Sequence, residues 1–152
     1  KNKISNALFA VDMEDTENLM PSELSGGMKK RIGIARAIAL NPKYLLYDEP
    51  TTGLDPITTG SINSLIKKIH NRGNITSIMV THELRTVYGV ADRVIMLDGK
   101  NIIFDDKPSE LINTNKSIIL KFIGNNKIVK KGERWIIVKN FLLLVLQFLY
   151  QL

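Results

Sequence analysis

Residues Tyr44-Leu45-Leu46-Tyr47-Asp48-Glu49-Pro50 decide the fold of this chain. Four apolar residues in a row are typical of a short strand buried on both faces, and an acidic pair follows them directly. A second apolar run, Ile75 to Val80, is expected to form another buried strand and is followed by Thr81-His82. Apolar residues between the two runs repeat at helical spacing, at Ile62, Leu65, Ile66 and Ile69. Strand, helix and strand in this order predict a parallel α/β sheet.

The rest of the chain, up to about residue 124, fits the same class. Helical patterns cover residues 4–11, 26–39 and 84–91, and a broken one runs from 108 to about 123. Apolar residues at 94–97 and 102–104 flank the turn Asp98-Gly99, which predicts a β-hairpin. We therefore expect a parallel sheet flanked by helices and ending in an antiparallel hairpin.

Composition narrows the class of protein. The 152 residues carry a net charge of +6, but the balance is only +2 over residues 1–124 and +4 over residues 125–152. A short basic tail accounts for most of the charge, so we expect no nucleic-acid partner for the main body. The absence of cysteine excludes a disulfide scaffold, a thiolate zinc site and thiol catalysis. Residues 1–10 lack the continuous apolar stretch of a secretory signal.

Three side chains that can handle a phosphate follow the two predicted strands: Asp48, Glu49 and His82. Ligands of open parallel sheets bind beyond the carboxyl ends of the strands, so we expect all three at one edge. One carboxylate can hold Mg²⁺ while its neighbour, on the other side of the strand, faces a water molecule. The imidazole can position that water or bond a terminal phosphate. Each feature alone has an ordinary structural explanation, as a polar turn or a satisfied histidine.

Two further loops have the composition of phosphate-handling segments. Ser25, Gly26 and Gly27 open a predicted helix, where bare backbone amides and the helix dipole attract an anion. The alternative is an ordinary N-cap serine after a glycine-containing loop. Gly53-Leu54-Asp55-Pro56 predicts a tight loop with an acid at its tip, or simply another turn.

The order of these four segments, over residues 1–124, resembles the ATP-binding subunit of ABC transporters. The resemblance implies a P-loop NTPase (RecA-like) fold, here incomplete. Residues 1–40 would be a signature-motif helical segment, and residues 41–124 the C-terminal part of the ATPase core with its hairpin. ATP and Mg²⁺ would be the cofactors.

The resemblance also implies a role for each site residue. Asp48 would be the magnesium carboxylate, Glu49 the general base for the hydrolytic water, and His82 the switch histidine. Ser25, Gly26 and Gly27 would contact ATP held by a second ATPase subunit, and Asp55 would couple the two sites of that dimer. The reaction would be in-line attack of water on the γ-phosphate.

Met28 and the preceding Met20-Pro21-Ser22-Glu23 are similar to the Mla/Mce-type phospholipid-transport ATPases, which include a plastid branch. This similarity implies lipid transport with a transmembrane permease. The subunit would lie in the cytoplasm on the inner membrane, or on the stromal side of a plastid membrane. Two alternatives stay open: a soluble ABC-type ATPase acting on the ribosome or DNA, and an inactive truncated product.

The phosphate-loop pattern Gly-x-x-x-x-Gly-Lys-Ser/Thr does not occur in the chain. In the family this loop lies upstream of the signature motif, so the sequence predicts the C-terminal portion of a subunit. We therefore expect no tight ATP binding or turnover by this polypeptide alone. Residues 125–152 are basic and then apolar, at Phe141 to Leu146. They are interpreted as a non-native tail or, alternatively, an interfacial helix.

Overall fold

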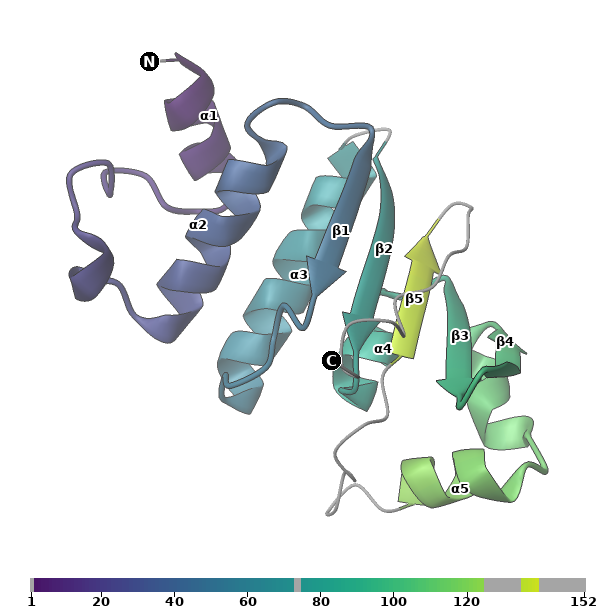
Figure 1. Ribbon diagram of the computed structural model, residues 1–152. Coiled ribbons are helices and arrows are strands. Elements are labelled where there is room, and N and C mark those ends of the chain that lie inside the picture. Colours follow the sequence, from purple (N-terminus) through teal and green to yellow (C-terminus); the bar gives the residue numbers. More distant parts are fainter. Residues whose placement is uncertain (1, 73–74, 125–134, 140–152) are drawn as a thin grey trace.

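A computed structural model of the chain describes residues 2–72, 75–124 and 135–139. Five α-helices, two 3₁₀ helices and five strands are assigned over these ranges (Figure 1). The helical elements are α1 (Asn2–Ala10), η1 (Pro21–Glu23), α2 (Gly26–Ile38), α3 (Pro56–Arg72), α4 (Leu84–Val90), η2 (Pro108–Asn113) and α5 (Ser117–Gly124). The strands are β1 (Tyr44–Asp48), β2 (Thr76–Thr81), β3 (Arg93–Asp98), β4 (Asn101–Asp106) and β5 (Trp135–Lys139).

The strands form one sheet in the order β1-β2-β5-β3-β4. Strands β1 and β2 pair in parallel, with Leu46 opposite Ile78. Strand β5 is antiparallel to both of its neighbours, so β3 runs in the same direction as β2. β3 and β4 form the expected antiparallel hairpin. The architecture confirms the predicted incomplete α/β P-loop NTPase class. The sequence analysis did not predict β5.

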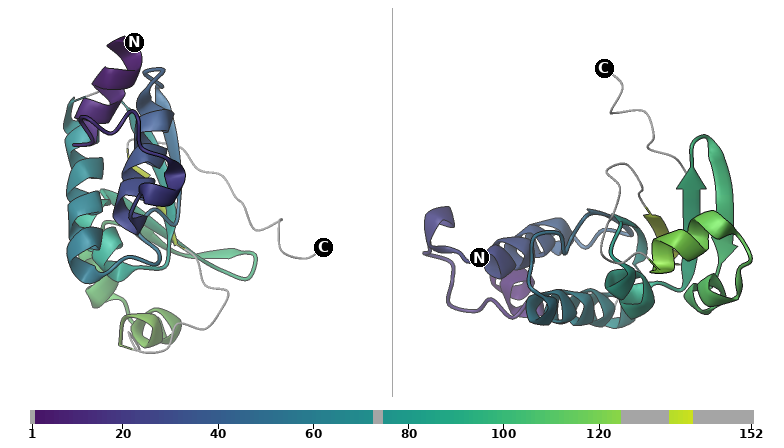
Figure 2. Two further views of the ribbon diagram at one scale, coloured as in Figure 1. Left: turned by 90° about the vertical axis from the view of Figure 1, so that its left-hand side faces the viewer. Right: turned by 90° about the horizontal axis from the view of Figure 1, so that it is seen from below.

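Helices α3 and α4 cover one face of the sheet, and the opposite face is open among the described elements (Figure 2). Along β1, Leu45 and Tyr47 are only 5% and 8% exposed, whereas Tyr44 and Leu46 are 69% and 72% exposed. The prediction that β1 is buried on both faces is therefore wrong. An uninterrupted apolar run shows only that both faces can be buried, and here one layer of helices covers one of them.

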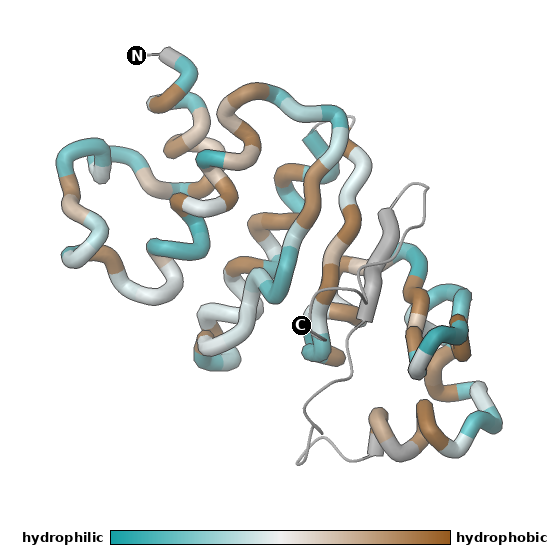
Figure 3. The backbone as a smooth tube through the Cα atoms, viewed as in Figure 1, coloured by the Kyte–Doolittle hydropathy of each residue, from teal (hydrophilic) through white to brown (hydrophobic). Residues whose placement is uncertain are grey.

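The core lies between the sheet and the helices (Figure 3). The apolar stripe predicted for α3 is buried, since Ile62, Leu65, Ile66 and Ile69 are at most 7% exposed. Val87 of α4 is fully buried beside it. Within the described ranges, no helix is long and apolar enough to cross a membrane.

Helices α2 and α3 both begin at the sheet edge where β1 and β2 end (Figure 1). Ser25 is the N-cap of α2, and Asp55 precedes Pro56, the first residue of α3. Asn41 ends the turn after α2 with φ 50°, a left-handed conformation that asparagine tolerates better than most residues. This arrangement brings two helix N-termini and two strand C-termini to one edge.

Candidate active site at the carboxyl edge of the sheet

Glu49 and His82 are hydrogen-bonded to each other across the ends of β1 and β2. His82 Nδ1 donates to Glu49 Oε1 at 2.8 Å, and the two side chains are 32% and 19% exposed. An ionised carboxylate only accepts hydrogen bonds, so this contact places a proton on Nδ1 and leaves Nε2 for another partner. The sequence analysis expected Glu49 and His82 at one edge of the sheet, because neighbouring parallel strands have their carboxyl ends at the same edge.

Glu49 has an unusual backbone conformation that several contacts hold in place. Its φ is 48°, in the left-handed region, which costs a non-glycine residue about 1–3 kcal/mol. Its N–H donates to Val80 O at 2.9 Å, and its carbonyl accepts from Lys30 Nζ at 2.9 Å. Thr52 Oγ1 donates to Glu49 Oε2 at 2.8 Å. Strained residues that are held on every side are common at active sites, so Glu49 is the best candidate here.

Asp48 is the last residue of β1 and is exposed. Val80 is its partner in the parallel register, which places Asp48 beside the site that Glu49 and His82 form. Among the described residues no three His, Asp or Glu side chains converge as a metal site. Magnesium usually takes one or two carboxylates together with water and phosphate oxygens, so a single exposed Asp48 fits that ion.

The Ser25-Gly26-Gly27 turn begins α2 at the same edge. Ser25 Oγ accepts from Met28 N at 3.2 Å, which is the N-cap geometry. A Cβ on Gly26 would lie 3.6 Å from Leu54, and one on Gly27 only 2.8 Å from Thr58 Cγ2. Close packing against Thr58 therefore disfavours any larger residue at Gly27. The amides of Gly26 and Gly27, in the first turn of the helix, precede the first intrahelical donors.

Asp55 caps the start of α3. Its Oδ1 accepts from the N–H groups of Ile57 and Thr58 at 2.9 and 3.0 Å. The hydroxyl of Thr58 also donates to this carboxylate, and these bonds lower the pKa of Asp55 below its ordinary value. The acid at the tip of this loop is thus fixed by the helix that follows it.

The structure brings the predicted site residues together in two groups. Glu49 and His82 touch, with Asp48 adjacent, whereas the Ser25–Gly27 turn lies against the loop that carries Leu54 and Asp55. No hydrogen bond within the described ranges joins the two groups.

Sequence reasoning missed four residues that support the first group: Lys30, Thr51, Thr52 and Glu83. Thr52 stands only three positions after Glu49, a spacing that suits a local hydrogen bond in a turn. No such signal existed for the other three, because their contacts span 19 to 32 positions.

A parallel strand pair with an acidic pair and a histidine at its carboxyl edge, beside a helix N-terminus, is consistent with an incomplete P-loop NTPase fold. Comparison with known proteins gives the family. Residues 1–52 match the ABC transporter family, and most of the chain is similar to ATP-binding proteins of transport systems.

Three relatives illustrate the similarity. The methionine import ATP-binding protein MetN of Carboxydothermus hydrogenoformans is 46% identical over 103 residues, covering 68% of this chain and 31% of the relative. The intermembrane phospholipid transport system ATP-binding protein MlaF of Haemophilus influenzae is 40% identical over 116 residues, covering 76% and 44%. MetN of Legionella pneumophila (strain Lens) is 42% identical over 124 residues, covering 81% and 36%. The chain thus spans less than half the length of these curated relatives.

Proposed function

We propose that this chain forms part of the ATP-hydrolysing subunit of an ABC transporter. The observation that carries the proposal is the 2.8 Å contact between Glu49 Oε1 and His82 Nδ1 at the carboxyl edge of two parallel strands. Similarity to known proteins supports it, since the named relatives are ATP-binding proteins of transport systems.

The site residues act together in this proposal. Asp48 holds the magnesium ion that accompanies ATP, and that ion neutralises charge on the phosphates. Glu49 accepts a proton from the attacking water as general base. His82, whose Nδ1–H is committed to Glu49, offers the Nε2 lone pair as an acceptor to the water, and donates from Nε2 to the γ-phosphate only when the ring is doubly protonated. Catalysis then rests on positioning and charge neutralisation, with no covalent intermediate on the protein.

The second group acts across a dimer in this proposal. Ser25, Gly26 and Gly27 present a helix N-terminus to ATP held by a second ATPase subunit, and the partial positive charge of the helix favours that contact. Asp55 lies in the adjoining loop and couples the two nucleotide sites. A transmembrane permease anchors the dimer on the cytoplasmic face of the membrane.

The transported substrate has two candidates. Most of the named relatives are methionine import proteins, and the first of them is 46% identical. MlaF is 40% identical, and the match covers 44% of its length, against 31% and 36% for the two MetN proteins; the similarity at Met20–Glu23 and Met28 also favours the phospholipid system. We place methionine import first and lipid transport second.

We also propose the division of the chain into residues 1–40, 41–124 and 125–152. The first part holds the signature turn and its helix, and the second the strands that carry Asp48, Glu49 and His82. The status of residues 125–152 as a native segment is tested by comparing the stability of the chain with and without them.

A chimera tests the function and the substrate together. The matched segment of this chain replaces its equivalent in MetN and, separately, in MlaF, and each chimera is purified with the permease of that relative. We expect Mg²⁺-dependent ATP hydrolysis, lost in Asp48→Asn and His82→Ala variants. Stimulation by only one permease identifies the transport class. Hydrolysis that is absent from both folded chimeras, or unaffected by both substitutions, contradicts the proposal. Salt-sensitive retention of the chain on RNA or DNA would favour the soluble alternative instead.

A further inference from the structure

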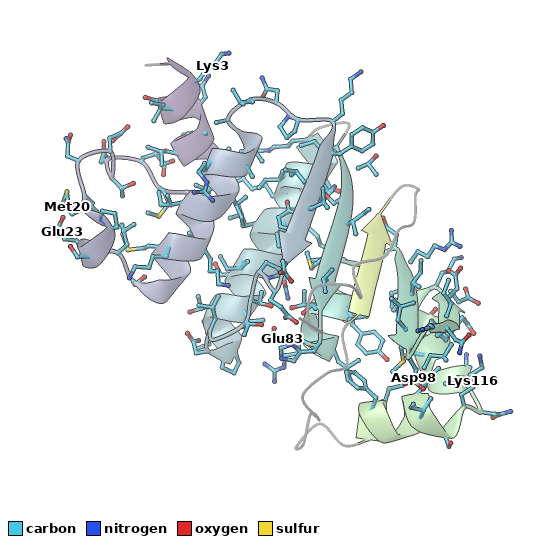
Figure 4. The ribbon with its side chains drawn as sticks, viewed as in Figure 1. Lys3, Met20, Glu23, Glu83, Asp98 and Lys116 are labelled. Carbon is cyan, nitrogen blue, oxygen red and sulfur yellow. The ribbon has the colours of Figure 1, made fainter. Side chains whose placement is uncertain are left out.

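Glu83 lies beside the candidate active site, and its side chain has no part in the roles assigned so far. It follows His82 directly and occupies the N-cap position of α4 (Figure 4). Its side chain makes no capping hydrogen bond with that helix. Instead, the carboxylate reaches across to the turn after β1, where Thr51 Oγ1 donates to Glu83 Oε2 at 2.6 Å.

The partners of Glu83 are buried polar groups. Thr51 and Thr86 are fully buried, and their hydroxyls lie 3.0 Å apart. Thr86 Oγ1 donates to Glu83 Oε2 at 3.3 Å, and Asn63 of α3 reaches Thr86 at 3.3 Å. Buried hydroxyls without partners are costly, so this cluster fixes the turn, α3 and α4 relative to one another.

The cluster is connected to Glu49 by neighbouring residues on both sides. Thr51 precedes Thr52, whose hydroxyl holds Glu49 Oε2 at 2.8 Å. Glu83 follows His82, whose ring holds Glu49 Oε1 at 2.8 Å. Thr51 is thus bonded directly to Glu83. Their neighbours Thr52 and His82 are connected through the Glu49 carboxylate, which both of them contact. We therefore expect loss of the Thr51–Glu83 bond to loosen Thr52 and His82 together.

We propose that Glu83 is a positioning residue for the Glu49–His82 pair, acting through Thr51. The inference deepens the proposed function and rests on it, because the pair matters for ATP hydrolysis only if that function holds. Its structural content, that Glu83 sets the hydrogen bonding of His82, is independent of nucleotide.

The experiment is histidine side-chain ¹⁵N NMR on the full chain. The sequence contains two histidines, so the spectrum needs little assignment. His70 is the internal control, because its Nδ1 faces Ile75 O beyond the far end of α3. In the wild type we expect His82 to carry its proton on Nδ1, as the Glu49 contact requires. Glu83→Ala and Thr51→Val should each shift His82 toward the other tautomer and leave His70 unchanged. The double variant should shift it no further.

Thr51→Ser keeps the hydroxyl and is the matched control, for which we expect the wild-type spectrum. If Glu83→Ala does not fold, the comparison of Thr51→Val with Thr51→Ser decides the question. Unchanged His82 signals in a folded Thr51→Val or Glu83→Ala variant would overturn the inference. The chimeras give the functional readout: Glu83→Ala should lower kcat about tenfold or more with KM for ATP unchanged, as expected for misplaced catalytic groups. Inactive chimeras with the NMR shifts intact would refute the function and leave the positioning role standing.

Discussion

Gly27 provides a direct test of the packing at the candidate site. A Cβ at this position would lie 2.8 Å from Thr58 Cγ2, closer than non-bonded carbons approach. Rotation of the Thr58 side chain would break the hydrogen bond from its hydroxyl to Asp55. The Gly27→Ala variant must therefore shift α2 against α3 or break this cap.

The magnitude follows from two opposing effects. Inserting a methyl group into a packed contact costs about 1–3 kcal/mol. Replacing glycine by alanine in a helix returns up to about 1 kcal/mol, and less in the first turn. We expect Gly27→Ala to lower the free energy of unfolding by about 1–2 kcal/mol. Gly33→Ala in the same helix has no atom within 4 Å of the new Cβ and should raise that free energy by about 0.5–1 kcal/mol.

Urea unfolding followed by circular dichroism measures both variants. The compensating change is Thr58→Ser, which removes Cγ2 and keeps the hydroxyl. Combined with Gly27→Ala, it should recover most of the lost stability, so that the two substitutions are strongly non-additive. A Gly27→Ala variant as stable as Gly33→Ala, or a double variant with purely additive losses, would refute the close contact between α2 and Thr58.

Three further predictions concern other parts of the chain. Asn41→Ala should be about 1 kcal/mol less stable than Asn41→Gly in the same urea assay, because φ is 50° there; equal stability would contradict the left-handed turn. Lys68 at 2.7 Å, with Arg31 at 3.0 Å, lowers the pKa of Asp12 below its ordinary value of 3.8. A carboxyl group whose pKa is lower in the folded than in the unfolded state stabilises the fold at pH values above its unfolded pKa. This stabilisation is lost as the pH falls through the folded pKa. The urea midpoint of Asp12→Asn should therefore fall less than that of the wild type between pH 7 and pH 3, with Asp15→Asn as the exposed control; parallel losses in the wild type and Asp12→Asn would be inconsistent with the ion pairs. Finally, titration of the chain alone with labelled ATP and Mg²⁺ should show no tight binding, and micromolar affinity would disprove the expectation drawn from the missing phosphate-loop pattern.

The sequence predicted the parts of the fold that depend on local periodicity and on strand direction. The stripe on α3 and the hairpin of β3 and β4 follow from apolar spacing. The meeting of Glu49 and His82 follows because parallel neighbours end at one edge. The sequence analysis left two interpretations of Ser25 open, a phosphate-contacting residue and an ordinary N-cap. The structure shows the N-cap geometry.

The rest depends on contacts that the sequence does not encode locally. An apolar run predicted two-sided burial for β1, but the number of layers depends on which other elements pack against the sheet. The left-handed backbone of Glu49 and its contact with Lys30 arise only when α2 lies beside the end of β1. The bond between Thr51 and Glu83 joins residues 32 positions apart. Strand β5 belongs to the segment 125–152, which the sequence analysis did not assign to the sheet.

The most direct test of the central claim is the rate of ATP hydrolysis by the Glu49→Gln variant of an active chimera, measured in a single turnover with ATP bound. Removal of a general base typically slows the reaction about 10²- to 10⁴-fold. We predict a loss of that size with ATP affinity retained, since glutamine keeps the size of the side chain and one of its oxygens as an acceptor. Hydrolysis at the rate of the unsubstituted chimera would contradict the assignment of Glu49 and His82 as the hydrolytic pair.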